Sequence, residues 1–232
     1  MTPAYSDTTV LVPVFNEAAT IADVLAAVRQ ALGEEVDILV VDDGSSDDSA
    51  LRAEACGARV LRLPTNQGKG AALRAGFLAA RGELVVTLDA DGQDDPSELP
   101  RLVEAARNGG DLVIGSRFIG NIHQGAISSI NALATRFFNR LINSLYNADI
   151  TDSQAGVRCF RRTLLRQISP RATEYEIETE MLVLALLLGA NVVEVPVSRF
   201  PRQSGSTSFS RIRHGLRILS TVLVNRMRRR AP

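Results

Sequence analysis

Short apolar runs alternate with helix-like stretches over the first half of this chain, and this alternation is what most limits its fold. The apolar runs are typical of buried strands and lie at 9–14, 36–41, 58–63, 83–88 and 111–115. The stretches between them, at 18–32, 47–56, 69–81 and 97–107, have the pattern and length of helices. Because strands that alternate with helices form parallel sheets covered on both faces, the sequence predicts an α/β fold with a mainly parallel sheet.

The second half of the chain has a different pattern. Apolar residues recur at helical spacing over 126–146, and a second, mostly apolar helix is expected over 174–189. A late strand is expected at 192–197 and a basic amphipathic helix at 210–229. A chain of 232 residues suits one large domain. We therefore expect one main domain over 1–208, with 209–232 as a helical appendage.

Composition narrows the cellular setting. Cys56 and Cys159 are isolated, without metal-binding spacing, which favours a reducing compartment. The N-terminus lacks the pattern of a signal peptide, and no apolar run reaches the ~20 residues of a spanning helix. We expect a cytoplasmic protein that does not cross a membrane.

Charge is unevenly placed along a chain whose formal net charge is zero. From Arg199 onward there are nine arginines and no acidic residue, whereas 17 basic and 26 acidic groups precede them. Such an arm is typical of a segment that meets an anionic surface, either nucleic acid or lipid headgroups. The 126–146 helix is equally compatible with the membrane surface and with core packing, whereas for the C-terminal helix the unbalanced charge favours the membrane surface.

Acidic residues follow three of the expected strands. Asp89 and Asp91 come directly after the run 84–88, Asp43 follows the second strand, and Glu17 follows the first. Carboxyl ends of parallel strands meet at one edge of a sheet, where such folds bind ligands. Two carboxylates at this spacing can hold a divalent cation that substrate phosphates complete. On its own, however, Asp89-Ala-Asp91 fits better with an Asp-rich turn in which Gly92 is the turn residue.

The loop from Asn66 to Gly70 precedes another helix and contains Lys69, the only lysine in the chain. Glycines let backbone approach a ligand, and a helix N-terminus favours anions. The loop lacks the third glycine of a dinucleotide motif and the spacing of a phosphate-binding Walker loop. A compact ammonium such as that of Lys69 is chemically suited to lie near a diphosphate.

Together these pieces resemble the inverting family-two glycosyltransferases. The resemblance rests on PVFNE, VDDGSSD, NQGKGAALRAG, LDADGQDDP, GSRF and DSQAGVRCF, which occur in this order between Thr9 and Ser208. It is strongest to the polyprenyl-phosphate (dolichyl-phosphate) mannosyl- and glucosyltransferase branch. It implies a GT-A fold with a Rossmann-like sheet, a nucleotide-diphosphate sugar donor, and Mg²⁺ or Mn²⁺.

The resemblance also implies roles for individual residues. It implies metal binding by Asp89, Asp91 and Gln93, and catalytic roles for Asp91, Asp152 and Arg117. An acid on a late helix is expected at Glu180, with Glu178 as the competing candidate. The residues expected to bind substrate are Pro13, Phe15, Glu17, Val41, Asp43, Lys69, Asp89, Ala90, Asp91, Gln93, Arg117, Arg158 and Arg202. The branch commonly carries a lysine where this chain has Ser208, and Arg199 or Arg211 are possible substitutes.

The group that accepts the sugar could be a lipid phosphate or a hydroxyl, and the sequence leaves both alternatives open. A lipid phosphate is already anionic near neutral pH, with a second pKa of about 6, so that positioning arginines matter more than a base. A hydroxyl acceptor needs a general base, for which Asp152 is the candidate. The donor is equally open among GDP-mannose, UDP-glucose and UDP-N-acetylglucosamine.

We expect transfer to polyprenyl or dolichyl phosphate by an enzyme bound peripherally to the cytoplasmic membrane face. The first alternative is a transferase of the same fold that acts on a glycan hydroxyl. A remote alternative is an inactive module that binds sugar nucleotides or nucleic acid. The basic tail lacks the interleaved aromatic residues that stack on bases, so nucleic-acid binding is not expected. Oligomeric state is not predicted.

Overall fold

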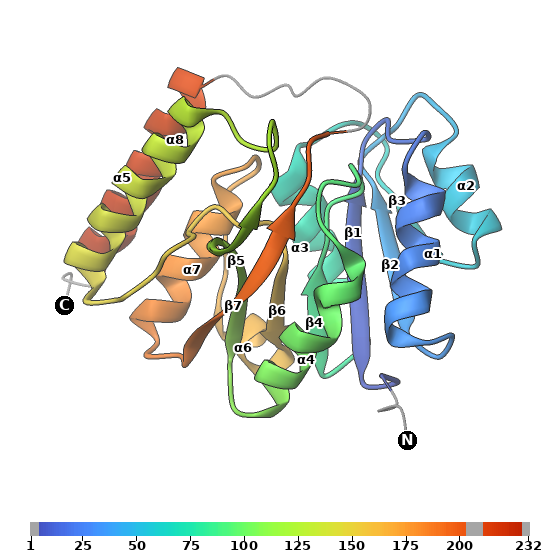
Figure 1. Ribbon diagram of the computed structural model, residues 1–232, viewed down its shortest axis with the longest axis horizontal. Helices are drawn as coiled ribbons and strands as arrows, with labels where there is room; N and C mark the ends of the chain where they lie inside the picture. Colours follow the sequence, from blue (N-terminus) through green and yellow to red (C-terminus); the bar gives the residue numbers. More distant parts are fainter. Residues whose placement is uncertain (1–4, 203–210, 229–232) are drawn as a thin grey trace.

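The computed structural model describes residues 5–202 and 211–228. Its centre is a seven-stranded sheet in the order β3-β2-β1-β4-β6-β5-β7 (Figure 1). Only β6 runs antiparallel to its neighbours β4 and β5, and every other pair is parallel. The predicted mainly parallel α/β sheet is therefore confirmed. The strands are β1 (Thr8–Val14), β2 (Asp37–Asp42), β3 (Arg59–Arg62), β4 (Leu84–Thr87), β5 (Leu112–Ile122), β6 (Arg158–Arg161) and β7 (Val192–Arg199).

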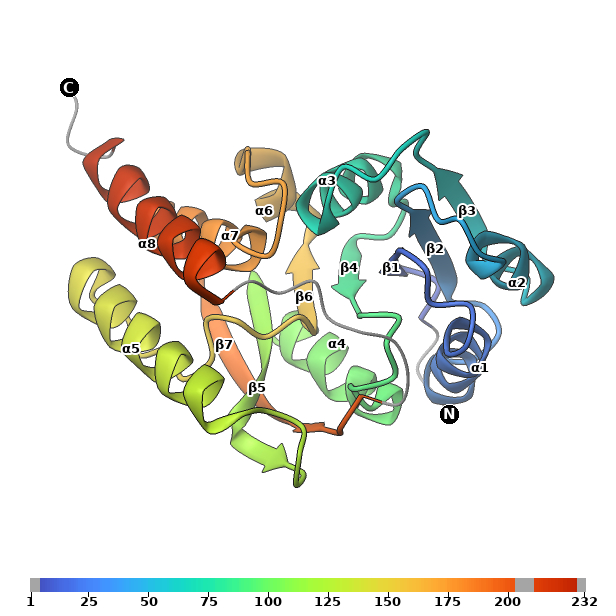
Figure 2. The ribbon, with the colours of Figure 1, turned by 90° about the horizontal axis from the view of Figure 1, so that it is seen from above.

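Helices cover both faces of the sheet, as Figure 2 shows from above. On one face lie α1 (Ile21–Leu32), α2 (Ser49–Ala55) and α4 (Leu99–Arg107), the last preceded by a 3₁₀ turn, η1 (Pro96–Glu98). On the other face lie α3 (Lys69–Ala79), α6 (Arg162–Gln167) and α7 (Ile177–Leu187). Two long helices, α5 (Ser129–Tyr146) and α8 (Arg211–Arg228), form a further layer outside α7.

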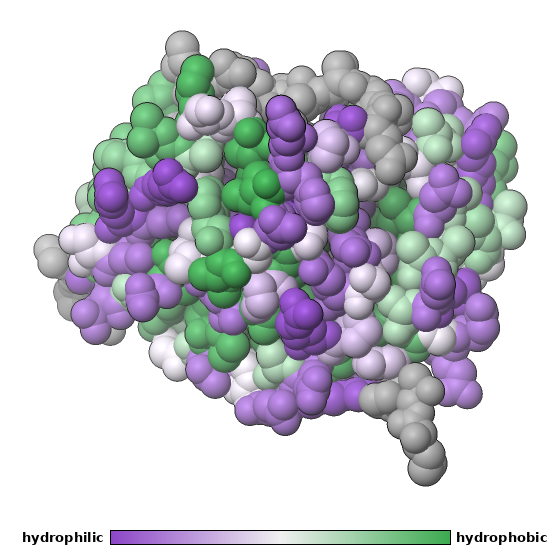
Figure 3. Space-filling model, in the orientation of Figure 1, coloured by the Kyte–Doolittle hydropathy of each residue, from purple (hydrophilic) through white to green (hydrophobic). Residues whose placement is uncertain are grey.

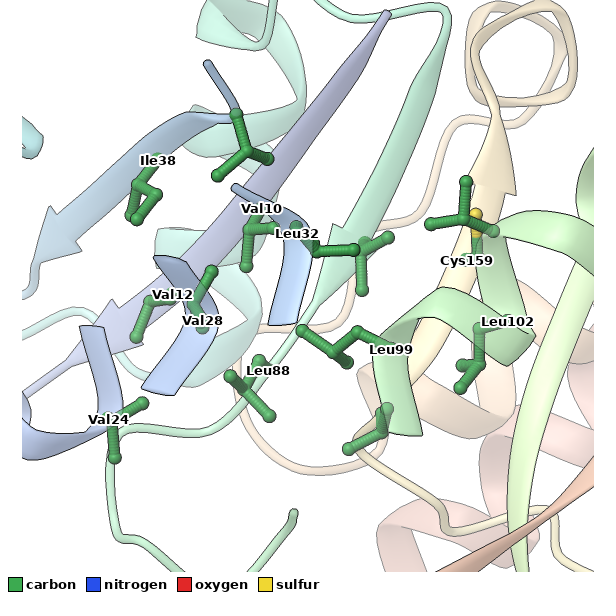
Figure 4. Packing of buried hydrophobic residues seen from close by; sticks show 14 of the residues in the cluster. Val10, Val12, Val24, Val28, Leu32, Ile38, Leu88, Leu99, Leu102 and Cys159 are labelled. Carbon is green, nitrogen blue, oxygen red and sulfur yellow. The ribbon is translucent and has the colours of Figure 1, made fainter. Parts of the chain in front are cut away.

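Alternate residues of each central strand pack into the two layers. In β1, Val10 and Val12 belong to the cluster under α1 and α4, whereas Leu11 belongs to the opposite cluster. Figure 4 shows the first of these clusters, in which Val28 and Leu99 reach the same core from their helices. Each fully buried side chain of this kind contributes about 1.5–3 kcal/mol to folding. The core thus fixes the sheet whose strand ends form the site.

Three features of the sheet and its helices were not predicted. Strand β5 continues to Ile122 instead of ending at residue 115, because its outer part pairs with the end of β7. Strand β6 and helix α6 were missed altogether. Arg158 and Arg161 bracket β6, so that its four residues show no apolar alternation that a sequence pattern could reveal.

Helix α8 packs against the rest of the molecule through part of its surface. Val222 is fully buried, and its carbonyl accepts a 2.6 Å hydrogen bond from the Tyr146 hydroxyl of α5. The expected domain boundary at residue 208 lies outside the described residues. Within the described ranges, no helix is both long and apolar enough to span a bilayer.

Candidate active site

The carboxyl ends of β1, β2 and β4 open into one cavity of about 890 Å³. Its wall is charged on the strand side and mainly apolar on the side of α5 and α8, where Ser128, Asn131 and Thr135 are the polar exceptions. Of the residues predicted to bind substrate or metal, the structure brings the following to this cavity: Pro13, Phe15, Glu17, Asp43, Lys69, Asp89, Ala90, Asp91, Gln93, Arg117 and Arg202.

An ion-paired triad lies at the cavity floor. The Lys69 ammonium is 2.6 Å from Asp89 Oδ1 and 2.7 Å from Glu178 Oε1. Burial opposes the charged forms, but Asp89 and Glu178 outweigh it and raise the pKa of Lys69. Burial likewise opposes ionisation of Asp89, yet the positive charge of Lys69, helped by Arg199, lowers the pKa of that carboxyl. Both groups therefore remain charged at neutral pH.

Asp91 has a different electrostatic setting from Asp89. Its Oδ2 lies 3.5 Å from Arg202 Nη1 and 3.8 Å from Arg199 Nη2, while its Oδ1 accepts a hydrogen bond from the Gln93 amide. Burial, and next the negative charge of Asp89, raise the pKa of Asp91. The two arginines only partly compensate for this cost. Asp91 is therefore a carboxylate that an additional cation would stabilise.

Two further acids border the part of the cavity near β1 and β2. Glu17 forms an ion pair with Arg202, yet burial keeps the pKa of its carboxyl above the usual value. Asp43 accepts hydrogen bonds of 2.8 Å from the amides of Gln67 and Gly68, and burial raises its pKa as well. Through these bonds Asp43 also holds the start of α3 against the end of β2.

The glycines on either side of Lys69 contact protein backbone. The Gly70 amide donates to the Thr173 carbonyl at 2.8 Å, and a Cβ on Gly70 would lie 2.5 Å from the Ala172 carbonyl oxygen. Gly68 has φ +93° and packs against Thr173 in the same way. The expectation that these glycines let the backbone approach a ligand is therefore wrong. Their missing side chains make room for the backbone of the segment before α7. Because this segment leads into α7, its close packing places Glu178 of α7 within ion-pair distance of Lys69.

This arrangement of acids and arginines occurs in a chain whose residues 9–169 match the family model "Glycosyl transferase family 2". The chain belongs to this family. The resemblance found in the sequence motifs is confirmed for the family.

Curated relatives in this family carry related names. The chain is 35% identical over 221 residues to the undecaprenyl-phosphate 4-deoxy-4-formamido-L-arabinose transferase of Klebsiella pneumoniae (strain 342), which covers 91% of this chain. It is 33% identical over 208 residues to glycosyltransferase AglJ of Haloferax volcanii, covering 89% of this chain and 67% of that relative. The chain spans 65% of the length of the Klebsiella relative.

Solved structures of similar fold include glucosyl-3-phosphoglycerate synthase from Mycobacterium tuberculosis in complex with Mn²⁺, UDP and glucosyl-3-phosphoglycerate. The TM-score is 0.74 at 26% identity, and the match covers 94% of this chain and 79% of that one. A second structure of the same enzyme, with UDP, matches with a TM-score of 0.77 at 24% identity and covers 95% of this chain and 80% of that one. The predicted GT-A fold is confirmed by these matches.

Asp152, the expected base of this family-two chain, is not placed to act as one. Its side chain is fully buried, and its two oxygens accept hydrogen bonds from Arg117 Nε and Nη2 at 2.6 and 2.7 Å. Its Oδ2 also accepts from the Arg117 amide. Asp152 does not line the cavity, whereas Arg117 does. The carboxylate therefore fixes the Arg117 guanidinium at the cavity wall.

Two other predicted substrate contacts are corrected by the structure. Arg158 is fully buried, and its guanidinium donates to the carbonyls of Ala155, Ser153 and Glu178. Val41 is fully buried in the sheet core. Neither side chain reaches the cavity. Both residues are structural. Val41 packs in the core beside the sheet, and Arg158 holds the segments that contain Ser153, Ala155 and Glu178 together through their carbonyls.

Of the two acids of α7 that were candidates for the site, Glu178 lies at the cavity and Glu180 does not. Glu178 lines the cavity and contacts Lys69. Glu180 faces away and accepts hydrogen bonds from the amides of Arg171 and Ala172 at 2.7 Å. Arg199 also reaches the cavity, where its Nη1 donates to Asp94 Oδ2 at 2.6 Å. Ser208 lies outside the described residues.

Several lining residues were not predicted as site residues. Tyr175 lies under the Lys69 ammonium, 5.8 Å from nitrogen to ring centroid, and Asn66 lines the cavity near Lys69. Their positions depend on how the 171–175 segment and the 66–70 loop pack, which no local pattern reveals. The apolar residues of the opposite wall were predicted as parts of two helices, not as site residues, and are Ile127, Ile130, Ala134, Phe138 and Ile218.

The oxygen donors at Asp89 and Asp91 suit a hard divalent cation. The described residues contain no group of three or more His, Cys, Asp or Glu side chains arranged to hold a metal. One or two carboxylates are nevertheless enough where substrate phosphates complete the coordination. The raised pKa of Asp91 fits such a site, because added positive charge would favour its ionised form. Gln93 is less suited, because its Oε1 accepts a 2.9 Å hydrogen bond from Arg199.

Proposed function

We propose that this chain transfers a hexose from a nucleotide-diphosphate sugar to a polyprenyl phosphate, with a divalent metal and with inversion at the anomeric carbon. The observation that carries the proposal is the two-sided cavity. Lys69, Asp89, Asp91 and arginines line one side, and apolar residues of α5 and α8 line the other. An acceptor with an anionic head and a hydrocarbon tail has this same division.

The donor side is assigned to the strand ends. Phe15 is 43% exposed at the cavity and offers a surface for a base. Asp43 and Glu17 offer acceptors to a base or ribose, as acids do at the corresponding edge of dinucleotide folds. Lys69 and Asp91 lie deeper and meet the diphosphate. The donor candidates remain GDP-mannose, UDP-glucose and UDP-N-acetylglucosamine.

Asp89 and Asp91 would hold Mg²⁺ or Mn²⁺ together with the diphosphate oxygens. When bound, the metal supplies Lewis-acid stabilisation of the negative charge that develops on the departing diphosphate. Relatives of similar fold crystallise with Mn²⁺ and UDP, which supports this assignment.

The proposed reaction is one in-line displacement. An oxygen of the acceptor phosphate forms a bond to the anomeric carbon of the sugar while the bond from that carbon to the donor diphosphate breaks. The nucleoside diphosphate leaves with the electron pair, and the configuration at carbon inverts. Lys69, held by Asp89 and Glu178, is a fixed positive charge beside the leaving group and needs no rearrangement at the moment of reaction.

The buried position of Asp152 supports the proposal of a phosphate acceptor over a hydroxyl acceptor. The base that a hydroxyl acceptor was expected to use is buried and fully engaged with Arg117. A phosphate monoester, with its second pKa of about 6, is ionised at neutral pH and needs positioning rather than deprotonation. Arg117, held rigid by Asp152, and Arg202 are suited to that positioning.

A donor panel tests the proposal. The purified chain is incubated with Mg²⁺ or Mn²⁺, polyprenyl phosphate and each of the three labelled donors, and the label is measured in the organic phase. We expect one donor to label the lipid, and chelation of the metal to stop the transfer. Label that reaches only water-soluble glycans would contradict the lipid acceptor. Binding of a donor without transfer to any acceptor would support an inactive sugar-nucleotide module instead.

A further inference from the structure

Helix α5 exposes an apolar stripe to solvent. Ile130, Leu133 and Phe137 are 58–67% exposed and follow one another at the three- and four-residue spacing of one helix face. The opposite face of α5 is buried through Phe138, Ile142 and Tyr146. The helix therefore packs on the core with one side and presents large hydrophobic side chains on another.

Helix α8 lies beside α5 and has a similar stripe. Leu216, Leu223 and Met227 are 42–63% exposed, while Ile218 and Val222 pack inward. Figures 1 and 2 show the two helices side by side and running in the same direction, and the hydrogen bond from Tyr146 to Val222 joins them. Figure 3 shows hydrophobic residues gathered at the upper left of the molecule, where α5 lies, with hydrophilic residues next to them.

Charge on these two helices has a single sign. Neither α5 nor α8 contains an acidic residue. Arg136 and Arg140 of α5 are exposed, as is Arg213 of α8. We call the six exposed apolar residues together with these three arginines the α5–α8 surface. Its composition is that of helices that lie in the headgroup region of a bilayer, with apolar side chains inserted and arginines near anionic lipids.

The α5–α8 surface adjoins the cavity. Ile130 belongs to both, since it is exposed and also lines the cavity. Ala134 and Phe138 of α5, with Gly215 and Ile218 of α8, continue the apolar wall inward from the N-terminal halves of both helices. A lipid that leaves a bilayer at this surface would therefore meet the apolar side of the cavity first.

We propose that the α5–α8 surface docks the enzyme on an anionic lipid bilayer, with both helices in the headgroup layer and the cavity opening toward the lipid. The proposal rests on the proposed function for its purpose, since a polyprenyl phosphate resides in a membrane. It goes further by giving α5 an equal part with the basic C-terminal helix. It also fixes which face of the molecule meets the membrane.

A second copy of the chain is the competing occupant. Two copies joined through this surface would bring arginines of like sign together, which costs free energy at an interface. Anionic headgroups instead attract each arginine. The one-sided charge therefore favours the bilayer.

Vesicle flotation of the full chain tests the proposal. We expect binding to phosphatidylcholine vesicles to increase when phosphatidylglycerol is included. The double variant Leu133→Gln/Phe137→Gln should lower the bound-to-free ratio at least about tenfold, because two apolar side chains no longer enter the bilayer. Leu216→Gln/Leu223→Gln should lower it by a similar factor. Arg136→Gln/Arg140→Gln should remove about fivefold per arginine, and only with phosphatidylglycerol present.

Leu78→Gln is the matched control. Leu78 is 89% exposed on α3, on a different helix, so its replacement should leave flotation unchanged. The far-ultraviolet circular dichroism spectrum should be the same in the parent and in all four variants, which shows that each is folded.

Two outcomes would overturn the proposal. One is equal flotation of the parent and the Leu133→Gln/Phe137→Gln variant. The other is a dimer in light scattering without vesicles that this variant abolishes, which would assign the surface to a second copy. A parent chain that floats as expected yet labels no lipid would contradict the proposed function alone.

Discussion

Charged side chains around the cavity stabilise one another through ion pairs that are largely shielded from water. Lys69 contacts two carboxylates, and Arg202 forms an ion pair with Glu17 near Asp91. Breaking one partner of such a buried pair leaves an uncompensated charge, which costs more than the intact pair contributes. Single substitutions at these residues should therefore change ligand binding as well as catalysis.

Asp91→Asn tests the metal and diphosphate assignment. The amide keeps the shape of the side chain but loses the charge, so we expect transfer to fall on the order of a hundredfold or more. Mn²⁺ binding, followed by electron paramagnetic resonance, should weaken as well. Asp48→Asn, an exposed acid outside the cavity, is the control. Transfer by Asp91→Asn at the parent rate would refute the assignment.

Glu178→Gln tests whether the triad tunes the metal site. Without the charge of Glu178, Lys69 has only Asp89 as an ionised partner and should compete more strongly for it. We expect Mn²⁺ affinity to fall about tenfold, the lower end of what outer partners of metal ligands contribute. Glu176→Gln, a buried acid that pairs with Arg217 instead, should bind Mn²⁺ like the parent. Equal Mn²⁺ affinity in parent and Glu178→Gln would rule this role out.

At the scale of elements, side-chain bonds link neighbouring strands and loops. Asp37 at the start of β2 accepts from Arg59 Nε and Nη2 of β3, both at 2.7 Å, and from the Thr9 hydroxyl of β1. Burial opposes its ionisation, but the hydrogen bonds from Arg59 and Thr9 lower the pKa of Asp37. One carboxylate therefore joins three strands.

Asp37→Asn should destabilise the fold in a pH-dependent way. A carboxyl whose folded pKa is depressed contributes stability above its unfolded pKa of about 3.9, and loses it as pH falls through the lower folded value. We expect a loss of about 1 kcal/mol at pH 7 after allowance for solvent screening, and a smaller difference from the parent below pH ~4. Urea unfolding at several pH values measures this. Glu54→Gln, which removes an exposed pair with Arg62, should show little change. A loss that is constant with pH would contradict the assignment.

Gly70→Ala tests the packing of α3 against the segment before α7. The new Cβ would lie 2.5 Å from the Ala172 carbonyl oxygen, so we expect a loss of about 1–3 kcal/mol in the free energy of unfolding. Gly215→Ala is the matched control, because a Cβ there meets nothing within 4 Å. It should raise the free energy of unfolding by about 0.5–1 kcal/mol, since alanine favours a helix. Equal stability of Gly70→Ala and the parent would contradict the close packing.

The sequence patterns located most elements but not every contact. Apolar runs identified β1, β2 and β4 because buried strands need such runs whatever surrounds them. The four-residue β6 escaped because its neighbours in the sheet, rather than its own pattern, hold it in place. Acids at strand ends could be predicted to converge, since parallel topology alone requires it. The ion pair of Asp152 with Arg117 could not, because it joins two segments that only the folded chain brings together.

At the scale of the whole molecule, three regions adjoin one another. The strand ends supply the charged side of the cavity, α5 and α8 supply its apolar side, and the α5–α8 surface continues outward from it. Relatives over most of this chain are named for transfer to undecaprenyl phosphate. The amphipathic acceptor that we propose would account for the juxtaposition of the three regions, because its anionic head and its hydrocarbon tail would each meet a matching environment.

The most direct measurement of this account compares two acceptors that differ only in the head group. Transfer of labelled sugar is followed as a function of pH with polyprenyl phosphate and with the polyprenol of equal length. We expect transfer to the phosphate to rise through about pH 6, as its second proton is lost, and then to level off. We expect the alcohol to be at least a hundredfold poorer, because Asp152, the base expected for a hydroxyl acceptor, is buried against Arg117. Comparable rates with the alcohol would contradict the central claim that the cavity uses an acceptor which is already ionised.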